Sequence, residues 1–154
     1  MQHDAETRGR ESVPLLLDRV IRFFETISPE QLSQIDGLYA PDCRFKDPFN
    51  EVRGTQAVHD IFAAMFRQVQ FPRFFVRQWL IDGRQAFLTW DFEFQLKRHQ
   101  QAQPLRIHGA SRLVFDDQGR IMLHRDYWDA AEELYEKLPL LGVLMRWLKK
   151  RAAH

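Results

Sequence analysis

The main change in the spacing of the apolar residues of this chain comes after Pro72. Before that point they recur at intervals of three and four residues, which is the period of an amphipathic helix. The pattern predicts one helix over 13–27, a short second helix over 29–38, and a third helix that begins at residue 55. The first helix carries its apolar stripe on Leu17, Val20, Ile21 and Phe24, and the third on Val58, Ile61, Phe62, Met65 and Val69.

From Phe74 onward, apolar and polar residues alternate, which is the period of a strand with one buried face. Trp90, Phe92 and Phe94, for example, are separated by single acidic residues. Strands are predicted at 74–81, 85–96, 105–115 and 120–128, with a short earlier strand at 43–47. Helices followed by a meander favour an α+β fold, in which the N-terminal helices pack on one face of a curved antiparallel sheet.

Composition limits the class of protein. With 154 residues, of which 45% are hydrophobic, the chain suits a single domain with a substantial core. Lys and Arg number 22 against 21 Asp and Glu, which gives a net charge of +1. Because nucleic-acid binding needs a clustered basic stripe, we expect no nucleic-acid partner.

The cysteine content and the N-terminus bear on the compartment. Cys43 is the only cysteine, and no Cys/His set has zinc-site spacing, so we expect a reducing cytoplasm and no structural metal. No stretch approaches the roughly 18 apolar residues of a membrane span. Residues 1–12 lack the apolar run of a signal peptide, and we interpret them as a disordered leader.

Residues 136–154 predict an amphipathic basic helix. Its apolar residues recur at helical spacing, and Lys149, Lys150 and Arg151 add positive charge near its end. Such a helix can close its own domain or lie on a membrane surface. We expect it to close the domain, with peripheral membrane contact as the alternative.

The chain has thirteen Phe, four Trp and three Tyr, more aromatic residues than a small core usually needs. This supply favours a cavity that is lined by rings and binds a small apolar molecule. The alternative is that most of these rings simply fill the core.

Two groups of polar residues are candidates for chemistry. In the stretch LHRDYWD, the two-residue period of a strand places His124, Asp126 and Trp128 on one face. Inside an apolar cavity Asp126 would orient His124 and fix its tautomer, whereas on an outer face the two would form a solvated pair. Asp47, directly before Pro48, either acts as a general base in an apolar surround or bonds the backbone of the following turn.

The order of these elements, with FKDP ending the first strand and VRGTQAVHDIF opening the third helix, resembles the nuclear transport factor 2-like superfamily over residues 13–135. The resemblance implies a cone-shaped α+β fold with a deep pocket. The segment LYAPDCRFKDPFNEVRGTQAV is similar to the ketosteroid isomerases, in which the aspartate before the proline is the general base, and Asp47 holds that place. Phe23 and Ser111 stand where those enzymes need a tyrosine and a protonated acid, so we do not expect steroid isomerisation.

A second resemblance is to the SnoaL-like polyketide cyclases of the same superfamily. Their last strand carries a His and an Asp two residues apart, and the Asp is the base of an aldol ring closure; His124 and Asp126 match this pair. The resemblance implies that both side chains point into the cone, while His108 faces outward or lies at the mouth. The implied pocket lining is Phe23, Phe45, Phe62, Trp90, Ser111 and Trp128.

Two classes of function remain open. In the first, the protein is an isomerase, cyclase or lyase without metal or other cofactor, in which Asp47 or Asp126 removes a proton next to a carbonyl and His124 or water handles the oxygen. In the second, the protein is a non-catalytic module: the same cone binds a small hydrophobic ligand without converting it, or the outer sheet face binds a protein partner. In this superfamily the outer sheet face commonly forms a homodimer, and we expect the same here. A metal site built from the three candidate residues is not required by their spacing.

Overall fold

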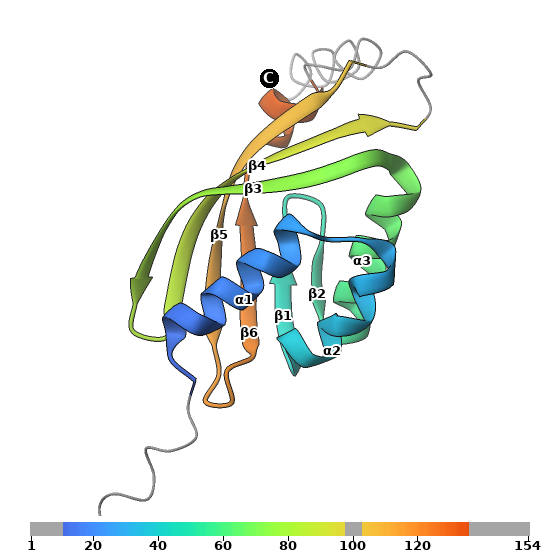
Figure 1. Cartoon of the computed structure of the whole chain (residues 1–154). Helices are drawn as coiled ribbons and strands as arrows, with labels where there is room; N and C mark the ends of the chain where they lie inside the picture. Colours follow the sequence, from blue (N-terminus) through green and yellow to red (C-terminus); the bar gives the residue numbers. More distant parts are fainter. Residues whose placement is uncertain (1–10, 98–102, 136–154) are drawn as a thin grey trace, which may run out of the picture.

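The computed structural model describes residues 11–97 and 103–135, and its elements follow the predicted order (Figure 1). The helices are α1 (Val13–Glu25), the 3₁₀-helix η1 (Pro29–Gln34), α2 (Ile35–Leu38), α3 (Thr55–Gln68) and the π-helical turn η2 (Ala131–Tyr135). The strands are β1 (Tyr39–Lys46), β2 (Glu51–Arg53), β3 (Val69–Asp82), β4 (Gln85–Leu96), β5 (Leu105–Phe115) and β6 (Ile121–Tyr127). The predicted helix at 136–154, and all but the last two residues of the predicted leader, lie outside the described residues.

The six strands form one curved sheet in the order β2-β1-β6-β5-β4-β3. Strands β3 to β6 form the predicted antiparallel meander, and Gly83 supplies the positive φ of +59° in the first hairpin turn. The α+β prediction is therefore confirmed. One pairing differs from the predicted antiparallel sheet, because β1 lies parallel to β6.

Strand β3 begins earlier than predicted. The helical pattern included Val69, and the strand was expected from Phe74, but the structure has Val69 as the first residue of β3. Phe71 has a positive φ of 54°, and the pairing register shifts just after Gln70. This irregularity takes Pro72, which has no N–H to donate, out of the ladder and lets the strand continue through it.

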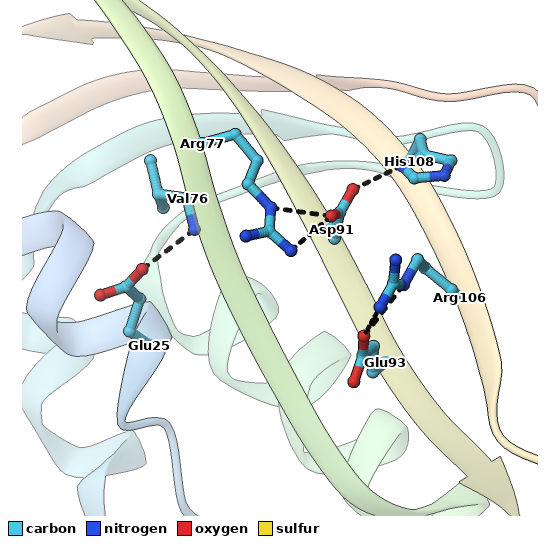
Figure 2. A network of polar contacts seen from close by, with 7 residues as sticks. All are labelled: Glu25, Val76, Arg77, Asp91, Glu93, Arg106 and His108. Atoms are coloured by element: carbon cyan, nitrogen blue, oxygen red, sulfur yellow. Dashed lines mark hydrogen bonds and ion pairs between the residues drawn. The ribbon is translucent and has the colours of Figure 1, made fainter.

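Helix α1 packs against the inside of the curved sheet (Figure 1). Its residues Leu16, Leu17 and Val20 are almost completely buried, and burial of one such side chain contributes about 1.5–3 kcal/mol. The end of the helix is held to β3 by Glu25, whose carboxylate accepts the backbone N–H of Val76 at 3.0 Å (Figure 2). Helix α1 therefore forms one wall of the space inside the sheet.

The inner face of β5 has room for a large ring from β4. A Cβ atom at Gly109 would lie 2.3–2.8 Å from three atoms of the Trp90 indole, well inside contact distance. The missing side chain lets the indole lie over β5, where its N–H reaches the hydroxyl of Ser111 at 2.8 Å. The sequence G-A-S at 109–111 thus provides both the space and the hydrogen-bond acceptor for one tryptophan.

Replacement of Gly109 by Ala should therefore displace the Trp90 ring and lower the free energy of unfolding by about 1–3 kcal/mol, as overpacking of a core does. Urea denaturation followed by circular dichroism measures this loss. The matched control is Gly37→Ala in α2, where a Cβ meets nothing within 4 Å and Ala should keep or raise stability. An equal effect of the two substitutions would contradict the packing argument.

Candidate functional site

Two aspartates come together where β1 and β6 end. The two strands run parallel, with Lys46 beside Arg125. The next residue along the chain is an aspartate in both cases, Asp47 after β1 and Asp126 within β6. Asp47 and Asp126 each follow the last pair of this ladder, and both line the same cavity.

This cavity, between the sheet and helix α3, has a volume of about 710 Å³. Pockets for small molecules measure about 300–1,000 Å³. The cavity wall holds eight aromatic side chains: Phe45, Phe49, Phe62, Phe74, Trp90, Phe92, Phe94 and Trp128. Several pack face to face, as Phe74 does on Phe92 with ring centroids 4.3 Å apart. Such a wall suits a flat, apolar molecule.

A chain of hydrogen bonds runs through the wall from Tyr39 to Trp90. The Tyr39 hydroxyl lies 2.7 Å from Nδ1 of His124, and Nε2 of His124 lies 2.7 Å from Oδ1 of Asp126. Ser111 donates its hydroxyl to the same Oδ1 at 2.5 Å and accepts the indole N–H of Trp90. Each polar group in this series of hydrogen bonds has a partner. A buried polar group without a partner would lower the stability of the fold by about 1–3 kcal/mol.

Tyr39 and Asp126, on opposite sides of the ring, together favour one tautomer of His124. Burial raises the pKa of Tyr39 well above its usual value, and the nearby carboxylate of Asp126 raises it further. The hydroxyl therefore stays protonated and is available to donate a hydrogen bond to Nδ1 of His124. In the matching neutral tautomer the ring proton is on Nε2, which faces the acceptor Oδ1 of Asp126.

One carboxylate oxygen of Asp126 is open to the cavity. The hydrogen bonds from Ser111 and His124 both end on Oδ1, and no donor within 11–97 or 103–135 bonds to Oδ2. The side chain is 17% exposed and borders the cavity and a small adjoining chamber. A carboxylate held by one oxygen and open at the other, in an apolar surround, has the geometry of a general base.

The carboxylate of Asp47 is engaged by the turn that follows it. Oδ1 accepts the backbone N–H groups of Phe49 and Asn50, both at 2.7 Å. The amide Nδ2 of Asn50 lies 3.1 and 3.0 Å from the two oxygens. This is the turn bonding that the sequence left open beside a catalytic role. Asp47 thus lies in the cavity wall with fewer free acceptor positions than Asp126.

Residues 20–124, more than half of the chain, match the SnoaL-like domain family. The chain belongs to this family. No curated protein matches the sequence closely.

Solved structures of SnoaL-like and nuclear transport factor 2-like proteins share the fold of this chain. A Shewanella putrefaciens protein classed with the SnoaL-like polyketide cyclases is 14% identical, with a TM-score of 0.69 over 83% of this chain and 96% of that one. An LEH-like epoxide hydrolase from M. tuberculosis is 17% identical, with a TM-score of 0.64 over 89% and 96%. A nuclear transport factor 2-like protein of unknown function from Exiguobacterium is 15% identical, with a TM-score of 0.64 over 74% and 98%. Likeness at these identities establishes the fold.

Most residues that the sequence assigned to the pocket of this SnoaL-like domain border the space inside it. Phe45, Phe62, Trp90 and Trp128 line the cavity, and Ser111 lines the adjoining chamber.

Phe23 lies elsewhere. It is only 5% exposed, yet it borders neither the cavity nor the chamber. Its neighbour Phe24 faces the chamber, with its ring centroid 5.7 Å from that of His124. Successive helical residues point about 100° apart, so Phe23 and Phe24 face different neighbours. Phe24 belongs to the apolar stripe of the first helix, and that stripe was the signal for its orientation.

Tyr39 was not identified from the sequence as a site residue of the SnoaL-like domain. The alternating pattern was recognised only from Cys43, whereas β1 begins at Tyr39. The available signal was the uninterrupted apolar run Leu38-Tyr39-Ala40 after a short helix. A tyrosine inside such a run is expected to be buried and therefore to need a hydrogen-bond partner.

His108 lies on the outer face of the sheet. Its imidazole is 63% exposed and contacts the carboxylate of Asp91 through Nδ1 (Figure 2). Arg77 donates a hydrogen bond to the same carboxylate through Nε at 2.8 Å and forms an ion pair with it through Nη2, also at 2.8 Å. Glu93 and Arg106 form a further pair on this face. The homodimer through this face stays a prediction.

Two absences concern the described residues alone. Among 11–97 and 103–135, no three His, Cys, Asp or Glu side chains form a group that could hold a metal ion. In the same part of the chain, no helix is both long enough and apolar enough to cross a membrane.

The proton positions in the buried chain can be tested by long-range ¹H–¹⁵N NMR of His124. The wild type should show an unprotonated, hydrogen-bonded Nδ1 and a protonated Nε2. Tyr39→Phe removes the donor to Nδ1, so the Nδ1 resonance should move toward that of a free imidazole nitrogen. The free energy of unfolding should fall by about 1–3 kcal/mol. A wild-type ring with its proton on Nδ1 would refute this arrangement.

Acid titration should reveal the Asp91 cluster on the outer face. Burial raises the pKa of Asp91, but the hydrogen bonds from Arg77 and His108 outweigh it, and the net pKa is lowered. A carboxyl with a lowered folded pKa stabilises the fold above its unfolded value of about 3.9 and loses this effect as pH falls through the folded value. Asp91→Asn should therefore lower stability most at neutral pH, with a difference that shrinks below about pH 3.9.

Urea denaturation across this pH range measures that difference, with Asp36→Asn at an exposed position as the control. A difference between wild type and Asp91→Asn that stays constant with pH would show that the ion pairs do not contribute.

Proposed function

We propose that this SnoaL-like domain is an enzyme that needs no cofactor and that uses Asp126 as a general base on a small, flat, apolar carbonyl compound. The observation that carries the proposal is the Asp126 carboxylate, which is anchored through Oδ1 and open at Oδ2 beside an aromatic cavity. Solved structures of the same fold that are named as a polyketide cyclase and an epoxide hydrolase support a chemical role for such a pocket.

The groups in the cavity wall restrict the substrate to compounds with an acidic C–H bond. Among the described residues that border the cavity and the chamber, none is Lys, Arg or Tyr. The donors of Ser111 and Trp90 are already used within the buried chain. An oxyanion hole built from a cationic side chain or a tyrosine is therefore missing from the described wall. Deprotonation of a carbon between two carbonyl groups needs less stabilisation from the protein, because the enolate shares its charge between two oxygens. The substrate class is thus a 1,3-dicarbonyl compound.

The proposed reaction begins with a proton transfer to Oδ2 of Asp126. The C–H bond of the carbon between the two carbonyls breaks, its electron pair forms the enolate, and Asp126 becomes a carboxylic acid. The enolate carbon then attacks a third carbonyl, further along the same molecule, and the resulting alkoxide takes the proton back from Asp126. Ser111 and His124 hold Oδ1 throughout, which keeps Oδ2 aimed at the substrate.

Asp47 has a supporting role in this proposal. Its carboxylate holds the turn that carries Phe49, and the Phe49 ring packs edge-on against Trp128 with centroids 5.4 Å apart. Both rings belong to the cavity wall. The turn thus shapes the wall next to Asp126.

Deuterium exchange of benzoylacetone in mildly acidic deuterium oxide tests the base directly. Wild-type protein should accelerate loss of the hydrogen between the two carbonyls, followed by proton NMR. Asp126→Asn keeps the shape and the acceptor for Ser111 and His124 but removes the base, so the enzymatic rate should fall by about 10²–10⁴-fold. Asp47→Asn is the matched control and should retain most of the rate.

Equal rates in wild type and Asp126→Asn would exclude Asp126 as the base. Saturable binding of benzoylacetone with no acceleration in wild type would instead favour a binding module that does not convert its ligand. Neither binding nor acceleration would exclude this substrate class.

A further inference from the structure

A small chamber of about 40 Å³ lies beside the cavity, between α1 and strands β3 to β6. Four residues border both spaces: Phe62, Phe74, Trp90 and Asp126. Asp126 therefore stands where cavity and chamber adjoin. A ligand with its reacting carbon at Oδ2 would have one part in each space.

The size of the chamber limits what can enter it. One water molecule needs about 10–15 Å³ of such space, so the chamber holds about three heavy atoms. The cavity, at about 710 Å³, is many times larger. The two spaces thus differ enough to accept only one orientation of an elongated ligand.

The chemistry of the chamber is apolar. Its wall includes Val20, Val76, Leu88 and Leu113, with Phe24 toward His124. Two of its polar groups, Ser111 and His124, already bond to their shared partner Asp126, whose open Oδ2 is an acceptor only. A polar end group would lose its hydrogen bonds to water and find few in return, which is costly. The chamber therefore favours a hydrocarbon chain.

The wall at Val76 is held in place from two sides. Its backbone N–H bonds to the carboxylate of Glu25 at the end of α1 (Figure 2), and it pairs with Trp90 of β4. Val76 and Leu88 border the chamber but not the cavity. Substitutions at these two residues can therefore change the depth of the chamber while the cavity wall stays intact.

We propose that the chamber selects ligands by chain length: a flat, apolar body occupies the cavity, and an unbranched alkyl end of about three carbons fills the chamber. The position of the reacting carbon at Asp126 rests on the proposed function. The length selection itself is a property of binding and can be measured without turnover.

Isothermal titration calorimetry with benzoylacetone and its homologues, in which the terminal methyl becomes ethyl, propyl, butyl or pentyl, measures this selection. Each methylene that enters the chamber should tighten binding by about fourfold. The gain should end at about propyl, and longer chains should bind no better or more weakly.

Chamber variants should move the preferred length in opposite directions. Val76→Leu fills part of the chamber and should shift the optimum to a shorter chain. Leu88→Ala enlarges it and should shift the optimum to a longer one. Ile107→Val, in the cavity wall only, should change all affinities by a similar factor and leave the optimum in place. Circular dichroism establishes that each variant is folded, and either chamber variant alone suffices for the test.

Affinity that rises steadily to the pentyl homologue, or an optimum that neither chamber variant moves, would overturn the proposal, as would a lack of binding by every homologue. A length optimum without deuterium exchange would support length selection by the chamber and refute the role of Asp126 as the base. Deuterium exchange without a length optimum would support Asp126 as the base and refute length selection by the chamber.

Discussion

The parallel pairing of β1 with β6 is the constraint on which the site depends. It joins the segment before α3 to the last strand of the meander, about eighty residues further along the chain. It also puts Phe45 beside His124 and directs the ends of both strands to one edge of the cavity. Tyr39, at the start of β1, reaches His124 for the same reason. Without this pairing, His124 would lack the Tyr39 hydroxyl that holds its ring beside Asp126.

The hydrogen-bond chain from Tyr39 to Trp90 can form only in one arrangement of the sheet. Its members come from β1, β4, β5 and β6, so it is complete only when all four strands have their native register. A slip of one residue would turn His124 or Ser111 to the outer face and leave its partners buried without hydrogen bonds. The same bonds that position the base therefore also favour one register of the sheet.

Local patterns predicted much of this structure. Spacing alone located α1 and the four meander strands, because each buries one face. The two-residue period of β6 placed His124 and Asp126 on one face, and the family resemblance pointed that face inward. The parallel partner of β6, the passage of β3 through Pro72 and the role of Tyr39 were not predictable in this way. Each depends on contacts between distant segments, which periodicity does not encode.

The difference between the two aspartates illustrates that limit. Both come at the end of a strand, and both border the cavity. Asp47 is followed by Pro48-Phe49-Asn50, so its turn supplies three donor groups that are local in sequence. Asp126 obtains its donors from Ser111 and His124, both held by the sheet, and both use the same oxygen. The local turn occupies both oxygens of Asp47, whereas the sheet residues hold Asp126 by one oxygen and leave the other facing the cavity. Asp126 is therefore the better placed base.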